Sequence, residues 1–327
     1  RKFKTIIIIG MGGSILGSES IYFALKKKIK KDFIFINNLD EDMVNKIRKK
    51  KNLDRILFIV ISKSGNTVET LSNFLALKLL KPKSKNLIKI SNRNNRTLSN
   101  LAKRKNINFI EHKKFIGGRY SVLSEVGMVP AYLMGLNIIK FRKNLLNQTQ
   151  YKKDKFLKSS SIALSNLLMS KKIVNLVLLS YEAKFDPFLY WVQQLIAESL
   201  GKNGRGFFPI ISTAPKDHHS LLQLYLDGPR DKIFYIFSEK RIDGNKLKGT
   251  AIDKELKFLK NKSLRKIKKA QKEALIKVFK KNKIPFREFE IKNLNEETLG
   301  ELFAYFMVET AIIGKMTNIN PFNQPAV

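Results

Sequence analysis

The chain of 327 residues contains no cysteine, only three histidines and no long apolar run. Without cysteine, disulfide bonds and thiolate metal sites are excluded, and three histidines argue against a histidine-rich metal centre. No apolar stretch approaches the roughly 18–20 residues that a membrane-spanning helix requires. The sequence therefore predicts a protein that spans no membrane, and we expect its chemistry to need neither a metal nor another cofactor.

Acidic residues are also scarce, because 27 Asp and Glu stand against 63 Lys and Arg and leave a net charge of +36. Such a balance is typical of proteins that bind nucleic acid. Here, however, the lysines are spread along the whole chain, and runs such as 26–31 and 280–283 lie at the ends of predicted helices, where the helix dipole favours cations. We interpret the charge as a general positive surface that attracts anionic metabolites, and we do not expect nucleic acid as a partner.

The N-terminal run RKFKTIIIIGMGG has a basic start and an apolar centre, as a signal peptide does. Its apolar part is too short and leads into a glycine-rich turn rather than a cleavage site, so we expect the first strand of a cytosolic protein. The chain opens on Arg1 and closes on Val327, within the segment NPFNQPAV, whose composition is typical of a binding site. We therefore expect both ends to be truncated.

Apolar runs typical of strands alternate with amphipathic helical patterns along the whole chain, and 43% of the residues are hydrophobic. This alternation predicts an α/β fold of doubly wound parallel sheets, each an αβα sandwich. The length suits two such units. We expect a first domain over residues 1–140, a polar and basic boundary over 141–158, and a second domain over 159–327.

The predicted elements follow from these patterns. In the first domain the strands are Thr5–Ile9, Phe33–Asn37, Leu57–Ile61, Leu87–Ile90 and Ile107–Ile110, and the helices are Ser14–Lys27, Thr67–Leu80, Leu98–Lys103 and Leu123–Leu136. In the second domain the strands are Val174–Ser180, Gly206–Ile211, Lys232–Phe237 and Phe286–Ile291, and the helices are Pro187–Leu200, His218–Leu226, Leu264–Lys281 and Glu296–Lys315.

The most informative stretch is LFIVISKSGNTVET, residues 57–70. An all-apolar run, typical of a strand buried on both faces, ends abruptly in hydroxyls, an amino group and a glycine before a helical pattern begins. A helix N-terminus after such a turn binds anions, because its free backbone N–H groups and its dipole point at the ligand. We interpret this turn as a phosphate site. The alternative is an ordinary capped helix, with Ser64 or Asn66 as its N-cap.

The turn after the first strand, GMGGS, invites the dinucleotide-binding fingerprint, but Ile15 stands at the third glycine position and the pattern fails. Gly12, Gly13 and Ser14 still let a ligand approach the backbone closely, and a sugar or a phosphate fits such a turn better. The alternative is that the glycines serve only a tight turn.

Two further segments carry groups suited to proton transfer. In FIGGRYSVLSEVG, residues 115–127, paired glycines permit an unusual backbone path that presents Arg119 to a cleft, where an arginine stabilises an oxyanion; the alternative is a surface arginine. In WVQQLIAESLGKNGRG, residues 191–206, Gln194 and Glu198 share one helical face. Glu198 lies near the helix C-terminus, where the dipole disfavours an anion and so favours a general base; the alternative is an exposed glutamate.

His218 and His219 begin a predicted short helix. Neighbouring side chains on a helix point about 100° apart, so the pair does not bind one metal. We expect one of them to act as an acid or base and the other to be solvated or to cap the helix.

These motifs together resemble the glucose-6-phosphate isomerase family, whose members are built from two sugar-isomerase (SIS) domains. The segment IGGRYS at 116–121 and the pattern Q-x-x-x-E-S-x-G-K at 194–202 are the specific features, whereas SKSGNTVET at 62–70 is general to SIS domains. The resemblance covers nearly the whole chain. It implies an aldose–ketose isomerase that acts on a sugar phosphate without a cofactor.

The resemblance also implies roles for single residues. Arg119 would stabilise an enediolate, Glu198 would move the proton between C1 and C2, and Gln194 would help to fix the substrate. His219 would aid ring opening from the partner subunit, which requires a homodimer. The substrate-binding residues it implies are Gly13, Ser14, Ser62, Lys63, Ser64, Thr67 and Gln324.

The chain departs from the family pattern at its C-terminal end. The family's aspartate and glutamine stand here as Asn323 and Gln324, and the resemblance places the catalytic lysine that follows beyond Val327. Ser64 stands where many relatives carry threonine, a change that keeps the hydroxyl. Two alternatives stay open: an isomerase of mannose 6-phosphate or an aminosugar phosphate, and a non-catalytic SIS module that senses sugar phosphates. A sensor needs the phosphate turn but no base, and Glu198 with Arg119 argues against it.

Overall fold

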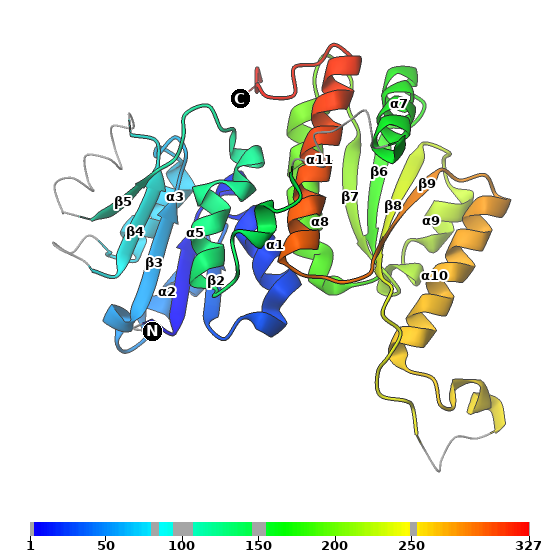
Figure 1. The fold of residues 1–327 in the computed structure, drawn as a ribbon, viewed down its shortest axis with the longest axis horizontal. Coiled ribbons are helices and arrows are strands. Elements are labelled where there is room, and N and C mark those ends of the chain that lie inside the picture. Colours follow the sequence, from blue (N-terminus) through cyan, green and yellow to red (C-terminus); the bar gives the residue numbers. More distant parts are fainter. Residues whose placement is uncertain (1–2, 80–84, 94–106, 146–154, 249–253, 327) are drawn as a thin grey trace.

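The computed structural model describes residues 3–79, 85–93, 107–145, 155–248 and 254–326. Two separate parallel sheets flank a central group of helices, as Figure 1 shows. Both sheets are parallel throughout the described residues, as the alternation of strands and helices predicts.

The first sheet has the strand order β2-β1-β3-β4-β5. Its strands are β1 (Thr5–Ile9), β2 (Asp32–Ile36), β3 (Ile56–Ile61), β4 (Leu87–Ser91) and β5 (Asn108–Glu111). Its helices are α1 (Leu16–Leu25), α2 (Glu41–Arg48), α3 (Val68–Ala76) and α5 (Glu125–Leu133). All six residues of β3 are buried, because helices cover both faces of the sheet.

The second sheet has the order β7-β6-β8-β9. Its strands are β6 (Asn175–Ser180), β7 (Phe208–Thr213), β8 (Lys232–Glu239) and β9 (Phe286–Ile291). Its helices are α7 (Lys155–Ser170), α8 (Asp186–Leu200), α9 (Leu222–Asp227), α10 (Leu264–Lys281) and α11 (Glu296–Met316). An apolar cluster that includes Tyr225 and Phe279 packs α9 and α10 on one face of this sheet.

The main core joins the two halves. Helices α1, α8 and α11 lie between the sheets, and one continuous apolar cluster runs from Ile6 in β1 through Trp191 in α8 to Phe303 in α11. Helices α1 and α8 run antiparallel, since Ser20 Oγ donates to the Pro187 carbonyl at 2.8 Å while Gly12 lies against Gln194. This packing brings the C-terminal end of α8 to the C-terminal edge of the first sheet.

The predicted strands are confirmed with ends displaced by at most two residues, and the predicted helices 264–281 and 296–315 are confirmed almost to the residue. The predicted helix 98–103 lies outside the described residues. The predicted helix 218–226 begins only at Leu222, because residues 216–218 form a short 3₁₀ turn. The boundary at 141–158 overlaps the start of α7, residues 146–154 are not described, and the division into two domains stays a prediction.

Within the described ranges, no helix combines the length and apolarity needed to cross a membrane. In those same ranges, no three acidic or histidine side chains gather as metal ligands would.

Candidate active site

The first sheet has a topological switch point, the place where open α/β sheets form a ligand-binding crevice. Strands β2 and β3 lie on opposite sides of β1. The helices that follow β1 and β3 cover opposite faces of the sheet, so the chain leaves the sheet in opposite directions at the C-terminal ends of β1 and β3. Such a switch point is where open α/β sheets bind ligands. The glycine turn after β1 and the hydroxyl-rich turn after β3 both lie there, and Gly10 sits directly against the carbonyl of Ile61.

Glu198 and Arg119 meet beside this crevice. Arg119 Nη1 donates to Glu198 Oε2 at 3.0 Å, Gln194 Nε2 donates to Oε1 at 2.8 Å, and Gln324 Nε2 donates to Oε2 at 2.7 Å. The carboxylate is therefore oriented from both sides. Its side chain stays 31% exposed, so a ligand can reach it, and the alternative of a freely exposed surface glutamate is wrong.

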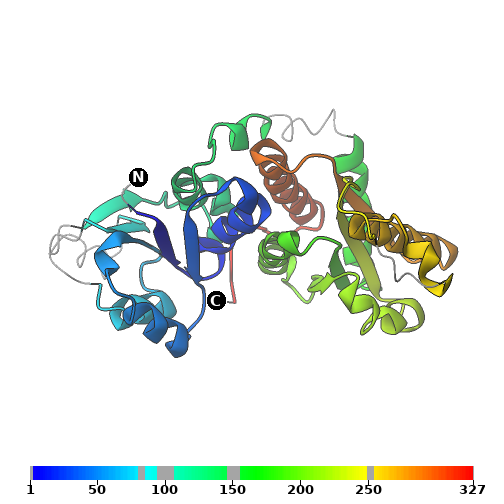
Figure 2. The ribbon, with the colours of Figure 1, turned by 90° about the horizontal axis from the view of Figure 1, so that it is seen from below.

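Arg119 is 3% exposed, and the alternative of a surface arginine is likewise wrong. Its Nε donates to Ser199 Oγ at 2.8 Å, and its Nη2 donates to the carbonyls of Pro321 and Asn323 at 2.6 and 3.1 Å. With the bond to Glu198, these contacts engage four of the five N–H donors of a guanidinium. The carbonyls come from the C-terminal segment, which runs from α11 toward the first sheet (Figure 2).

We predicted that the glycines at 117–118 permit an unusual backbone path, and this prediction is wrong. Neither residue has a positive φ, and a Cβ added to Gly118 would meet nothing within 4 Å. The close approach occurs instead at Gly13, where a Cβ would lie 2.3 Å from the Gly118 carbonyl oxygen. Gly12 has φ +49°, and a Cβ there would lie 2.7 Å from Gln194 Nε2. The glycine turn thus lets the segment carrying Arg119 and the side chain of Gln194 come together.

The turn after β3 brings three side-chain hydroxyls close together. Ser62 Oγ lies 3.0 Å from Thr67 Oγ1, Ser64 Oγ lies 3.4 Å from Thr67 Oγ1, and the Gly65 N–H donates to Ser62 Oγ at 2.9 Å. The N-cap of α3 is Thr67, without a side-chain capping bond, so the alternative with Ser64 or Asn66 as N-cap is wrong. The start of α3 therefore presents backbone donors and hydroxyls together, as an anion site does.

Lys63 and Lys202, both close enough to Arg119 to feel its charge, have lowered pKa values. Burial, and secondly the positive charge of Arg119, lower the pKa of Lys63. The same two causes lower the pKa of Lys202, whose Nζ donates to the carbonyls of Ser199 and Asn320 at 2.9 and 2.7 Å. Several cations thus converge here without an equal number of carboxylates, so the field at the crevice attracts anions.

Within one chain, His219 lies apart from Glu198 and Arg119. Its side chain is exposed, and it lies two residues after Asp217, which accepts from the Thr213 N–H. Because Thr213 Oγ1 also donates to Asp186 at the start of α8, His219 lies near that end of the helix. Glu198 lies near the other end of α8, so about 18 Å of helix separates the two regions. His218 instead contacts the Tyr181 hydroxyl at 3.0 Å, and burial lowers its pKa.

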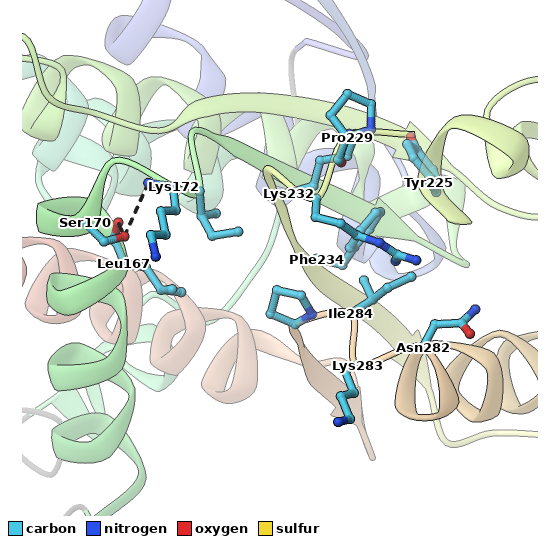
Figure 3. Close-up of a pocket in the computed structure, with 13 residues that line it drawn as sticks. Leu167, Ser170, Lys172, Tyr225, Pro229, Lys232, Phe234, Asn282, Lys283 and Ile284 are labelled. Atoms are coloured by element: carbon cyan, nitrogen blue, oxygen red, sulfur yellow. Dashed lines mark hydrogen bonds between the residues drawn. The ribbon is translucent and has the colours of Figure 1, made fainter. Parts of the chain in front are cut away.

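A separate cavity of about 450 Å³ lies between the ends of α7 and α10 and the start of β8 (Figure 3). Its walls are apolar at Phe234 and Ile284, and its lysines do not converge on one point. None of the predicted site residues lines it, and the switch-point crevice remains the candidate active site.

The sequence reasoning missed the residues that hold Arg119 in place. Ser199 and Tyr120 stood inside the two quoted motifs without an assigned role, and the carbonyls of the C-terminal segment carry no side-chain signal. Ser14 lies in the 3₁₀ turn Gly12–Ser14 that follows β1, and its role in binding substrate stays a prediction.

Comparisons with known proteins identify relatives of this chain. The sequence model of the family described as phosphoglucose isomerase matches residues 1–206. A glucose-6-phosphate isomerase from Methanocaldococcus jannaschii is 33% identical over an alignment that covers 99% of this chain and 82% of that protein.

Two solved structures share the fold. A glucose-6-phosphate isomerase from Chlamydia trachomatis matches with a TM-score of 0.81 at 20% identity, over 99% of this chain and 67% of that one. A hypothetical protein from Thermus thermophilus matches with a TM-score of 0.89 at 23% identity, over 99% and 81% of the two chains. Because the family model matches residues 1–206 and the Methanocaldococcus jannaschii enzyme is 33% identical over 99% of this chain and 82% of its own, the chain belongs to the phosphoglucose isomerase family.

Proposed function

We propose that this protein interconverts glucose 6-phosphate and fructose 6-phosphate through a cis-enediol intermediate. The observation that carries the proposal is the contact between the Glu198 carboxylate and the Arg119 guanidinium at 3.0 Å, beside a turn rich in hydroxyls at the switch point of a parallel sheet. An isomerase needs a base, an oxyanion stabiliser and an anchor for the phosphate, and this crevice contains a candidate for each: Glu198, Arg119 and the turn after β3.

Glu198 is the base in this mechanism. It removes the proton from C2 of the open-chain aldose while the C1 carbonyl oxygen gains a proton, and the same carboxyl group then returns its proton to C1 while the C2 hydroxyl loses one. Gln194 and Gln324 hold the two carboxylate oxygens in place, so the base needs little reorganisation. Arg119 stabilises the negative charge that develops on the enediolate oxygens.

The phosphate binds at the turn after β3. Ser62, Ser64 and Thr67 donate hydroxyl hydrogen bonds, Lys63 supplies charge, and the N-terminus of α3 supplies backbone donors. Gly13 and Ser14, from the neighbouring turn after β1, approach the sugar. Binding energy from this remote group positions the reacting carbons.

The assembly we propose is a homodimer in which His219 of one subunit assists ring opening in the site of the other. The separation of His219 from Glu198 along α8 within one chain supports this assignment. A cytosolic location also stays a prediction, as does the absence of nucleic acid among the partners.

A coupled assay from fructose 6-phosphate to glucose 6-phosphate, on the full-length natural chain, tests the proposal. Glu198→Gln keeps the shape of the side chain but removes the base, and we expect kcat to fall about 10²–10⁴-fold. Glu273→Gln, on the exposed side of α10, is the matched control and keeps parental activity.

The alternatives give different results. A folded parent that binds sugar phosphate without isomerising it would contradict the proposal and leave the sensor. A higher kcat/KM for mannose 6-phosphate or an aminosugar phosphate would assign another isomerase.

A further inference from the structure

A closed ring of hydrogen bonds holds the edge of Arg119 that turns away from Glu198. Arg119 Nε contacts Ser199 Oγ at 2.8 Å, Ser199 Oγ contacts the Tyr120 hydroxyl at 3.0 Å, and that hydroxyl contacts the Pro321 carbonyl at 3.2 Å. Arg119 Nη2 closes the ring on the same carbonyl at 2.6 Å. Three chain segments, namely residues 119–120, the end of α8 and the C-terminal segment, therefore meet at one guanidinium edge.

The direction of every bond in this ring is determined. Arg119 has no acceptor, so Ser199 Oγ accepts from Nε. The Tyr120 hydroxyl donates its single proton to the Pro321 carbonyl, because a carbonyl oxygen can only accept. Ser199 must then donate its own proton to Tyr120. Each hydroxyl both accepts and donates, an arrangement in which the bonds strengthen one another.

The surroundings favour this arrangement. The Ser199 side chain is wholly buried, and its hydroxyl has no access to solvent as a replacement partner. Burial raises the pKa of Tyr120, so that the phenol keeps its proton. The Tyr120 ring packs against Phe322 with 5.3 Å between ring centres, which fixes the C-terminal segment to the same group.

We propose that Tyr120 and Ser199 are positioning residues, which set the in-plane orientation of the Arg119 guanidinium so that Nη1 faces Glu198 and the reacting oxygens. This inference rests on the proposed isomerase function. Neither residue lies in the phosphate-binding turn, so removing either hydroxyl loosens Arg119 without removing the anchor of the substrate. The effect falls on kcat, not on KM.

Ser199→Ala and Tyr120→Phe each delete one hydroxyl from the ring. In the full-length chain we expect each to lower kcat roughly 10- to 100-fold with KM changed less than about threefold, because misplacing a catalytic group acts on the chemical step. Since either change opens the same ring, the double variant should be no worse than the more severe single variant. Ser165→Ala, which removes another buried serine hydroxyl in α7, is the control and keeps kcat.

Single variants with parental kcat, or a double variant whose losses multiply, would overturn the proposal. A second readout does not depend on the reaction: the Arg119 Nε–H resonance in NMR should be protected from exchange in the parent and lose protection in Ser199→Ala. If the parent shows that protection but no isomerase activity, the proposed function fails and the ring stands. Unprotected Nε–H in an active parent would mean that the ring does not form.

Discussion

At the scale of single residues, the position of Arg119 depends on the absence of a side chain at Gly13. A methyl group there would lie 2.3 Å from the Gly118 carbonyl oxygen and 2.6 Å from the Arg119 nitrogen, and both contacts are with backbone, which cannot turn aside. Gly118, on the other side of the same contact, has open space where its own Cβ would be.

This difference predicts opposite outcomes for two similar substitutions. Gly13→Ala should lower the free energy of unfolding by about 1–3 kcal/mol through overpacking and should reduce kcat by displacing Arg119. Gly118→Ala should change stability by less than about 0.5 kcal/mol and keep activity. Urea unfolding and the isomerase assay measure both quantities; equal losses in the two variants would show that the contact is not the cause.

The lowered pKa of Lys63 predicts a pH dependence of substrate binding. A lysine holds a phosphate dianion while it is charged, and its charge disappears at a lower pH than for an ordinary lysine, because burial and Arg119 lower its pKa. KM should therefore rise as the pH increases through the alkaline range.

Arginine stays charged across that range, so Lys63→Arg should flatten this rise. Lys202→Arg is the matched variant and should leave the parental profile unchanged, even though the pKa of Lys202 is lowered too. A flat parental profile, or a change that follows Lys202, would contradict the assignment of Lys63 to the phosphate.

At the scale of elements, α11 determines where the C-terminal segment reaches Arg119. A buried ion pair fixes this helix to the second sheet, since Arg287 in β9 donates to both carboxylate oxygens of Glu309 in α11, which is 3% exposed. Arg287 also lies over the Tyr235 ring at 4.0 Å, and Ser160 and Tyr305 donate to Glu309.

Removing one partner of this ion pair should lower the free energy of unfolding more than replacing both partners with apolar residues. Arg287→Met leaves a buried carboxylate without its cation, and we expect a loss of about 3–5 kcal/mol in the free energy of unfolding. The double variant Arg287→Met with Glu309→Leu removes both charges and should be more stable than the single variant. Denaturant unfolding tests the order, and a double variant that is less stable than Arg287→Met would contradict it.

At the scale of the whole molecule, the two halves contribute different parts of the site. Under the proposed mechanism, the first sheet supplies the phosphate turn and the Arg119 segment, whereas α8 and the C-terminal segment supply the base and two glutamines that hold it. His219 lies near the opposite end of α8, so under the proposed mechanism its function requires a second copy of the chain.

Mixing two inactive variants tests this arrangement. Glu198→Gln and His219→Ala are each expected to lose most activity on the cyclic sugar phosphate. Subunits exchanged at equal amounts should regain about a quarter of the parental activity, because half of the dimers are mixed and each contains one intact site. No recovery among dimers shown to have exchanged would place His219 and Glu198 in the same subunit's site or outside catalysis altogether.

Much of the fold was predictable because the signals are local. The all-apolar strands, the turns that end them and the amphipathic helices follow from spacing within a few residues, as the confirmed run Ile56–Ile61 and helix α10 show. The identities of Glu198, Arg119 and Gln194 as neighbours came from motifs, and the structure brings the three together. A prediction failed where a neighbour distant in sequence decided the outcome, as for the glycines at 117–118, because the close backbone approach occurs at Gly13 instead.

The sequence by itself determined the class of fold, the family and the residue types in the crevice, because strand and helix periods and short motifs are written in consecutive residues. Only the tertiary structure decided which groups meet. It placed Gly13 under the Gly118 carbonyl, joined Arg119 to Ser199, Tyr120 and Pro321, and separated His219 from Glu198 by the length of α8. The contacts of Arg119 with Ser199 and Pro321 join residues 80 and 202 positions apart in the chain, and such pairings depend on how sheets and helices pack rather than on any local pattern.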